Sequence, residues 1–382
     1  MKFLRRHRFI VFLVSCFIIG FITMPLFHGG YFSDLMTSIK NVKWYFHILL
    51  FIGTFMLTIL LHELAHFLTF IAKGYKNEVL IILFFIFYKS NNKWRVKIDF
   101  KLLILGGGMA YPTLGEINDE NDFIKAKNAM LSSLLVAPVF TFVSGFVLLL
   151  LSLVFFYKIP YLVVIAIYTS IFSFLFTYSS TKETKELKGD FKAYQRVKND
   201  DEFALLILLQ YADSTLYLSQ LVKDKLLLMN KNHSLKYLSF LSYLIEDELL
   251  SSKIDIDIYN YVYDYSKVFN FRRLLLSYEG FSIAQSLLFY FHKCNFSSRV
   301  EKLIEIYKNE LLKSKLKDKN KEFLLKQTLH LLNIENHFEY INNANNIHNN
   351  NLSFITKHIP SIIESEIKRN EGIEPFALEC KI

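Results

Sequence analysis

The sequence has few cysteines, and their spacing shows no paired motif. Its three cysteines, Cys16, Cys294 and Cys380, are far apart and form no CxxC motif. We therefore expect neither a disulfide framework nor a metal site built from thiolates. The chain also lacks a segment in which basic residues are interleaved with aromatic ones, although its formal net charge is +9. This absence argues against nucleic acid as a partner.

Long apolar runs are missing from the second half of the chain. Overall, 52% of the residues are hydrophobic and 16% are aromatic, which is high for a soluble protein. The excess lies before residue 180, whereas the later part is rich in Lys, Glu, Asp and Asn at helical spacing. We therefore predict a mainly α protein in which a membrane domain precedes a soluble one.

Four segments are long and apolar enough to cross a hydrocarbon core about 30 Å thick, which takes about 20 helical residues. They are 9–27, 44–72, 129–157 and 160–179. No small-x-small cleavage site follows the first, so we expect it to be retained as a span. Basic residues cluster at 1–8 and between the second and third spans. This pattern predicts a multi-pass protein of the cell membrane with a cytoplasmic N-terminus and a cytoplasmic C-terminal domain.

The segment between the second and third spans, 79–114, has a different pattern. Its apolar pieces are short, rich in β-branched and aromatic residues, and interrupted by Asn-Asn and by Gly-Gly-Gly. They predict strands joined by turns, forming a small membrane-associated β-hairpin. An open strand in lipid would leave its backbone groups without partners, so the hairpin should pack beside protein or line a wet cavity.

The second half predicts a soluble all-α domain of helical hairpins. Apolar residues recur three and four positions apart, with no repeat consensus, in 202–222, 235–250, 271–291, 300–312 and 321–332. We assign 197–340 to this cytosolic, repeat-like domain. The remaining segment, 341–382, begins with the Asn-rich stretch INNANNIHNNN and is expected to be a linker and a weakly ordered tail.

The stretch LLHELAHFLTF, 60–70, places three ionisable side chains in the second span. On a helix, His62 and His66 lie one turn apart on the same face, so both can bind one Zn²⁺ at about 2.0–2.1 Å. Glu63 can then act as a general base toward a metal-bound water. Ionisable groups are costly in a membrane and indicate function, although a satisfied polar contact in the helix is the other interpretation.

A catalytic zinc ion also needs a third protein ligand and one open position. The histidines lie near the cytoplasmic end of the second span, where the fourth span also ends. The candidate ligands are therefore the carboxylates that follow the fourth span: Glu183, Glu186, Asp190, Asp200 and Asp201.

Four motifs together resemble the site-2-protease family of intramembrane zinc metalloproteases: HELAH, LGGGMAYP, VAPVFTFVSG and LKGDFKAY. The resemblance covers about residues 44–196, so 1–196 is interpreted as a transmembrane zinc metalloprotease domain. It implies that one zinc ion is held by His62, His66 and Asp190, and that the hairpin glycines Gly106, Gly107 and Gly108 contact the substrate. Glu186 remains the alternative third ligand, because a glycine follows the aspartate in that family, whereas Gly189 precedes it here.

These observations lead to three functional hypotheses. The first is an intramembrane zinc metalloendopeptidase with Glu63 as general base. It would act on single-span membrane proteins or hydrophobic peptides in the lipid bilayer, and its helical domain would bind a cytosolic protein partner. The second is a zinc protease of another HExxH class that uses a downstream Glu and cleaves at the membrane surface. The third is a non-catalytic, protease-like scaffold or immunity protein.

Overall fold

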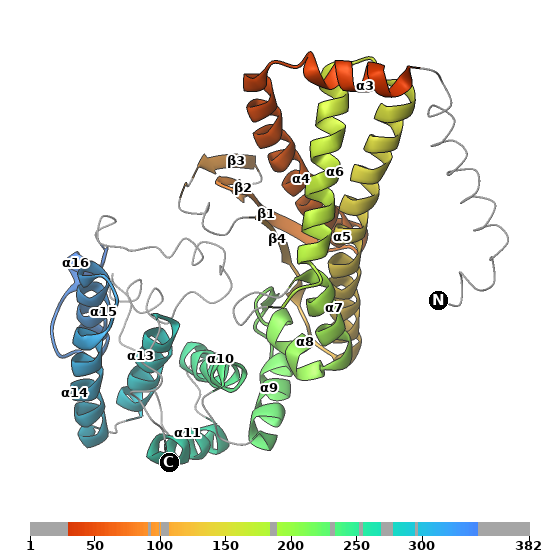
Figure 1. The fold of residues 1–382 in the computed structure, drawn as a ribbon. Helices are drawn as coiled ribbons and strands as arrows, with labels where there is room; N and C mark the ends of the chain where they lie inside the picture. The colour runs from red at the N-terminus through yellow and green to blue at the C-terminus, as the bar shows by residue number, and fades with distance from the viewer. Residues whose placement is uncertain are drawn as a thin grey trace. The chain divides into compact units, whose positions relative to one another are not determined.

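The computed structural model describes most of the chain between residues 30 and 342. The described residues are 30–90, 93–98, 100, 107–183, 189–229, 234–251, 255–268, 278–294 and 297–342. The predicted first span, 9–27, lies outside them, as does the predicted linker and tail, 341–382, apart from its first two residues, which end α16. The fold is mainly helical (Figure 1). Its contacts define two units, one formed by 1–112 and 128–199, the other by 113–127 and 200–382.

Among the described residues, three helices are long and apolar enough to cross a membrane. They are α4 (Trp44–Ala72), α5 (Glu120–Phe155) and α6 (Pro160–Ser179). The predicted spans 44–72 and 160–179 are confirmed residue for residue. A shorter helix, α3 (Tyr31–Lys40), contacts α6 and lies across the end of the bundle (Figure 1). The helix α7 (Asp190–Asn199) follows α6 after a loop.

The predicted third span, 129–157, corresponds to a longer helix, because α5 begins at Glu120 and ends at Phe155. Asp119 caps this end, since its carboxylate accepts a hydrogen bond from the backbone N–H of Asp122 at 2.8 Å. Glu120 and Asp122 add negative charge to the first turn, which the helix dipole favours. These polar residues lengthen the helix beyond the apolar segment on which the prediction depended.

The segment after α4 forms a four-stranded sheet with the strand order β3-β2-β1-β4. Its strands are β1 (Lys76–Ile82), β2 (Phe85–Ser90), β3 (Lys93–Ile98) and β4 (Gly108–Thr113). The predicted hairpin is present as β2 and β3, which pair antiparallel with Phe87 opposite Val96. It is part of a larger sheet, because β1 pairs antiparallel with β2 and β4 flanks β1.

The sheet packs against α4 through an apolar cluster. Leu80, Ile82 and Leu83 are buried with Ile59 of α4, which is completely buried. Burying side chains of this size contributes about 1.5–3 kcal/mol each. The cluster therefore fixes the sheet beside the turn of α4 that carries the HELAH motif, which starts three residues after Ile59.

The second unit consists of helices that contact one another in chain order. In sequence, α9 contacts α10, α10 contacts α13, and α14 contacts both α13 and α15, as expected for helical hairpins. The helices are α8 (Asp201–Leu208), α9 (Leu216–Leu228), α10 (Leu235–Ser251), α11 (Ile256–Val268), α13 (Tyr278–Lys293), α14 (Ser297–Lys313), α15 (Asp318–Leu331) and α16 (Phe338–Asn342).

The single helix predicted for 202–222 was wrong. The structure has α8 and α9 there, separated by the short strand β6 (Ala212–Asp213), which pairs in parallel with β5 (Gly115–Glu116). A new helix starts because Thr215 is an N-cap: its hydroxyl accepts a hydrogen bond from the backbone N–H of Leu218, which satisfies one of the free donors at the helix start. The same hydroxyl donates to the carbonyl of Ile117.

Candidate metal centre

The HELAH motif lies on α4, where helical geometry places its three ionisable side chains close together. His62 is 7% exposed and Glu63 is 6% exposed, so both are buried. The imidazole rings of His62 and His66 have centroids 5.0 Å apart. The fourth-residue spacing thus brings both rings to one face of the helix, as the sequence predicts.

Asp190, the first residue of α7, completes a group of three potential metal ligands. Its Oδ2 atom lies 3.0 Å from His62 Nε2 and 3.6 Å from His66 Nε2. Two atoms that are each about 2.0–2.1 Å from a tetrahedral zinc ion lie roughly 3.3 Å apart. The observed distances fall on either side of this value, and the three ligand atoms all lie within 4.8 Å of one another. Two imidazoles and one carboxylate therefore fit zinc.

The charge balance of this group favours an ionised Asp190. Burial by itself would raise the pKa of the Asp190 carboxyl, but the imidazoles of His62 and His66, which lie against it, outweigh burial and hold this pKa below its usual range. A carboxylate, rather than a carboxylic acid, is the form that binds a cation.

Gly189 allows Asp190 to reach the histidines. The backbone N–H of Gly189 donates to the carbonyl of Lys182 at 3.0 Å, and that of Phe191 donates to the carbonyl of Ser180 at 3.0 Å. A Cβ atom on Gly189 would lie 2.5 Å from the carbonyl oxygen of Ser179 and 2.5 Å from the Cα of Ser180. The chain therefore packs backbone against backbone at the end of α6, and only glycine fits.

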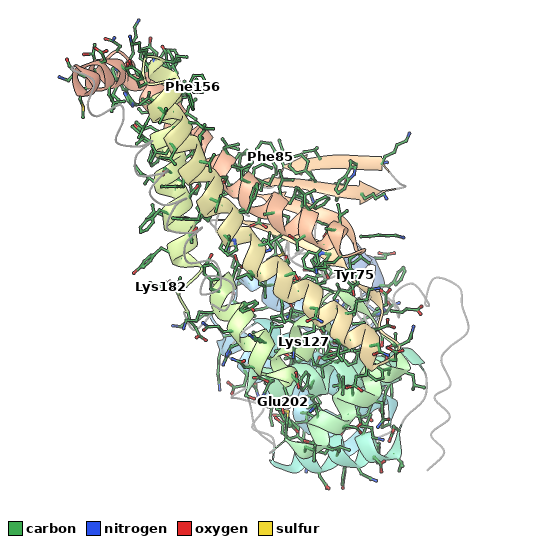
Figure 2. The ribbon with its side chains drawn as sticks, turned by 90° about the vertical axis from the view of Figure 1, so that its right-hand side faces the viewer. Tyr75, Phe85, Lys127, Phe156, Lys182 and Glu202 are labelled. Carbon is green, nitrogen blue, oxygen red and sulfur yellow. The ribbon has the colours of Figure 1, made fainter. Side chains whose placement is uncertain are left out.

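The HELAH motif of α4 and Asp190, which follows α6, lie at the same end of the helix bundle. Figure 2 shows Phe156, which follows α5, at one end, and Tyr75 and Lys182, which follow α4 and α6, toward the other. Since α4 packs against α6, the last turns of both helices lie close together. This packing explains how residues far apart in the sequence meet at one point.

The outer nitrogens of both imidazoles contact hydroxyl groups of α5. His62 Nδ1 lies 3.0 Å from Thr141 Oγ1, and His66 Nδ1 lies 2.8 Å from Ser133 Oγ. Both hydroxyl residues are buried, at 0% and 1% exposure. Nothing in the sequence marks these two residues, because Ser and Thr in an apolar helix commonly bond to their own helix backbone.

Glu63 contacts strand β4 rather than the three ligand atoms of the metal site. Its carboxylate accepts a hydrogen bond from the backbone N–H of Ala110. A Cβ atom on Gly108 would lie 2.4 Å from Glu63 Cγ, so the strand can approach this closely only at a glycine. Gly107 precedes the strand and accepts a hydrogen bond from the backbone N–H of Leu83 at 3.0 Å. Gly106 lies outside the described residues.

Three other carboxylates that follow the fourth span have different partners. Glu183 is 4.0 Å from Arg196 and nearly half exposed. Asp200 caps α8 through the backbone N–H of Phe203, and Asp201 pairs with Lys127. Glu186 lies outside the described residues. Among the residues that the structure describes, the one group of His, Cys, Asp and Glu side chains that could hold a metal ion is thus His62, His66 and Asp190.

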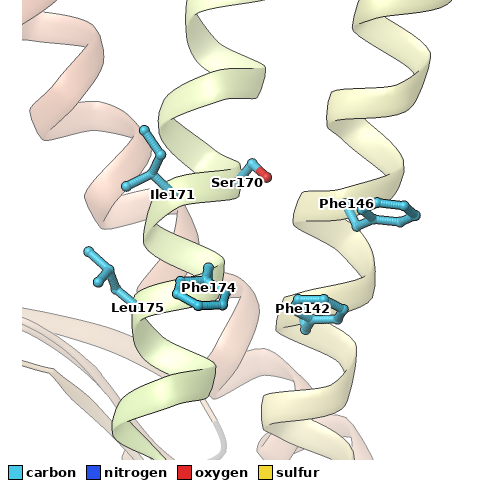
Figure 3. Close-up of a pocket in the computed structure, with 6 residues that line it drawn as sticks. All are labelled: Phe142, Phe146, Ser170, Ile171, Phe174 and Leu175. Atoms are coloured by element: carbon cyan, nitrogen blue, oxygen red, sulfur yellow. The ribbon is translucent and has the colours of Figure 1, made fainter. Parts of the chain in front are cut away.

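A cavity of about 320 Å³ between α5 and α6 is separate from this group. Figure 3 shows its lining, which is aromatic and aliphatic apart from one serine: Phe142, Phe146, Ser170, Ile171, Phe174 and Leu175. No titratable side chain lines it, so it provides no acid, base or metal ligand.

Comparison with known proteins identifies one family. The family model described as peptidase family M50 matches residues 50–361, most of the chain. The matched range includes both histidines, Glu63 and Asp190. No curated protein and no solved structure matches the chain.

Proposed function

Because the chain belongs to peptidase family M50, the site-2-protease family, it is a membrane zinc metalloprotease, and we propose that it cleaves peptide bonds within or near the bilayer. In this proposal His62, His66 and Asp190 hold one zinc ion and Glu63 is the general base. The observation that carries this proposal is the convergence of three ligand atoms within 4.8 Å of one another. Glu63, the one residue of the HELAH motif that can transfer a proton without being a metal ligand, is adjacent to His62 in the sequence.

A zinc ion bound there would lower the pKa of a bound water and polarise the carbonyl of the scissile bond. Glu63 takes a proton from the water and returns it to the leaving amine. The backbone N–H of Ala110 holds the Glu63 carboxylate in place. Burial of Glu63 among α4 and β4 excludes bulk solvent from it, which strengthens its electrostatic interactions with His62 and Asp190.

The position of β4 at the edge of the sheet, as far as the described residues go, supports the proposed mode of substrate binding. This strand is at one edge of the sheet and contacts Glu63 through Gly108. A helical substrate must unwind before hydrolysis, because its carbonyls are hydrogen-bonded. Pairing with an edge strand replaces the lost backbone bonds. We propose that single-span proteins or hydrophobic peptides bind there in extended form and contact Gly106, Gly107 and Gly108.

We also propose a topology and a division of labour. Basic residues before the first predicted span and between α4 and α5 favour a cytoplasmic N-terminus and a cytoplasmic C-terminal domain. Residues 1–196 would then be the protease domain, 197–340 a cytosolic helical domain that binds a regulatory protein, and 341–382 a linker and tail.

The test is metal analysis of the purified protein combined with a cleavage assay. We expect one zinc ion per chain in the wild type, and its loss in His62→Ala and Asp190→Ala. Glu63→Gln should keep the zinc ion but fail to cleave single-span fusion proteins in reconstituted vesicles, with a loss of at least about 10²–10⁴-fold, the usual contribution of a general base.

Two controls separate the alternatives. Glu183→Ala removes a nearby carboxylate that is paired with Arg196 and should leave the zinc content unchanged. Glu186→Ala should also keep zinc. Loss of zinc in this variant but not in Asp190→Ala would transfer the third ligand to Glu186. A wild type without zinc would refute the proposal, and full function of Glu63→Gln would favour a non-catalytic scaffold.

A further inference from the structure

We propose that Thr141 and Ser133 of α5 are positioning residues that hold the two imidazoles with Nε2 directed at the metal, and that Thr141 also dictates the tautomer of His62. This inference rests on the proposed zinc site and assigns to α5 a role in building it. Neither hydroxyl contacts the reacting atoms; both act through the histidines.

The tautomer of His62 follows from the hydrogen bonds of Thr141. A hydroxyl group has a single proton to donate. Thr141 Oγ1 lies 2.8 Å from the carbonyl oxygen of Ala137, to which it donates that proton. Toward His62 Nδ1, at 3.0 Å, Thr141 can therefore only accept. The proton of the neutral imidazole must then be on Nδ1, which leaves the lone pair of Nε2 available for a metal.

Because both partners are buried, this hydrogen bond determines the tautomer of His62. Thr141 is 0% exposed and His62 is 7% exposed, so bulk water cannot replace the lost partner. Breaking the bond would leave a buried N–H without an acceptor, which is unfavourable. The alternative tautomer would place two acceptors against each other at this point.

Ser133 has a looser role at His66. Its Oγ lies 2.8 Å from His66 Nδ1, and within the described part of the chain His66 is its one hydrogen-bond partner. The Ser133 hydroxyl can rotate to donate or to accept, so it orients the ring without imposing a tautomer. The two histidines thus differ: the one nearer to Asp190 Oδ2, His62, is also the one whose tautomer is fixed.

The helix α5 is itself held against the helix that leads to Asp190. Thr177 of α6 donates to the carbonyl of Pro138 at 3.2 Å, between the positions of Ser133 and Thr141. At Gly145, a Cβ atom would lie 2.4 Å from the hydroxyl oxygen of Ser173 in α6. The hydroxyl groups and the third metal ligand are therefore anchored to one another through close packing of α5 and α6.

The chain offers a matched control at Thr58 of α4. Like Thr141, Thr58 is 0% exposed and its hydroxyl donates to the carbonyl four residues earlier, at 2.8 Å. This hydrogen bond involves no histidine. Valine has nearly the shape of threonine but lacks the hydroxyl, so either substitution removes a buried hydroxyl and its hydrogen bond to the helix backbone. Only Thr141→Val also removes the hydrogen-bond partner of an imidazole.

The experiment measures zinc affinity of the detergent-purified full chain by competition with a chelator. Loss of an outer hydrogen-bond partner usually weakens metal binding about 10–100-fold, so we expect a loss of that size for Thr141→Val. Thr141→Ser should restore affinity to near the wild-type value, Thr58→Val should not change it, and Ser133→Ala should weaken binding less than Thr141→Val.

Cobalt substitution gives a second readout that does not depend on activity. The visible absorption of Co²⁺ reports the geometry of its ligands. We expect Thr141→Val to change the spectrum and Thr141→Ser to restore it, with Thr58→Val like the wild type. If Thr141→Val binds zinc as tightly as the wild type and gives the same cobalt spectrum, the inference is wrong.

An equal loss in Thr58→Val would also overturn the inference, because it would assign the effect to the helix rather than to the imidazole. If Thr141→Val does not fold, Ser133→Ala still tests whether the hydroxyl groups orient the imidazoles. A Ser133→Ala variant with the zinc affinity and cobalt spectrum of the wild type would overturn the inference. A wild type that binds no metal is a different outcome, since it refutes the zinc proposal itself.

Discussion

The first unit, which we call the membrane unit, and the second, which we call the helical unit, both shield carboxyl groups from solvent. The side chains around these groups differ, and Asp190 is only partly buried. In the membrane unit, Asp190 meets His62 and His66, so that three ligand atoms point at one position. In the helical unit, Glu248 is 5% exposed and accepts hydrogen bonds from the Tyr290 hydroxyl at 2.8 Å and from the backbone N–H of Asp255 at 3.0 Å. In the first arrangement, the lone pairs of three ligand atoms point at one position and can bind a cation. In the second, neutral donors form hydrogen bonds with one carboxyl group.

This difference shows that burial of an ionisable group does not by itself identify a functional site. Burial indicates function in α4 because several side chains from distant segments converge there. Glu248 is as buried as Glu63, yet its hydrogen bond with Tyr290 fits a structural role that links α10 to α13. The comparison also predicts different sensitivity to substitution: small changes of shape should disrupt the membrane site, whereas the helical unit should respond mainly through its stability.

Gly189→Ala should have the largest effect among the changes that leave every ionisable group in place. The new Cβ would lie 2.5 Å from the backbone of Ser179 and Ser180, so the segment must move and carry Asp190 with it. Misplacement by about 1 Å can cost on the order of 10²-fold in function. We expect zinc affinity, measured by chelator competition, to fall by at least this factor.

Gly53→Ala in α4 is the matched control, because a Cβ there meets nothing within 4 Å, and it should bind zinc like the wild type. Unchanged zinc affinity in Gly189→Ala would contradict the argument that close backbone packing places Asp190.

Gly108→Ala should separate catalysis from metal binding. Its Cβ would lie 2.4 Å from Glu63 Cγ and 2.5 Å from the carbonyl oxygen of Ile81, whereas no ligand atom of the metal site is among its nearest neighbours. We expect kcat for cleavage of a single-span fusion protein to fall about 10–100-fold, with zinc content unchanged. A change in KM alone would instead indicate that Gly108 contacts only the substrate.

The sequence predicts those features that depend on local pattern. The bounds of α4 and α6 follow from the apolar length needed to cross hydrocarbon, and the pairing of His62 with His66 follows from helical spacing. Asp190 could be proposed only through the family resemblance, since five carboxylates follow α6 and a spacing rule does not select one of them. Its position beside the histidines depends on the packing of α4 against α6.

Other features could not be predicted because they depend on contacts between distant segments. Nothing local in α5 marks Thr141 or Ser133 as partners of histidines, since each could equally bond to its own helix. The glycines of LGGGMAYP were expected to contact a substrate, but the contact of Gly108 with Glu63 depends on how the sheet packs against α4. The break between α8 and α9 was missed because the Thr215 cap lies inside a continuous amphipathic pattern.

The smallest expected effect lies in the helical unit and depends on pH. Burial raises the pKa of the Glu248 carboxyl to about 7, from a usual value of 4.5. Below about pH 4.5 this group is protonated in both the folded and the unfolded state, so its stabilising contribution is fully present. As the pH rises to about 7, the unfolded state releases the proton first, and the free energy of unfolding therefore falls. At about 1.4 kcal/mol per pKa unit, the loss amounts to a few kcal/mol at most.

Hydrogen exchange of the full chain, corrected for intrinsic rates, measures this effect in α10. We expect protection of α10 amides to fall between about pH 5 and pH 8 in the wild type, and to depend less on pH in Glu248→Gln, which cannot ionise. Glu301→Gln, at an exposed position of α14, should behave like the wild type. The same pH dependence in Glu248→Gln as in the wild type would refute the link between ionisation of Glu248 and the stability of α10. A loss of zinc in this variant would mean that Glu248 also affects the metal site and is not purely structural.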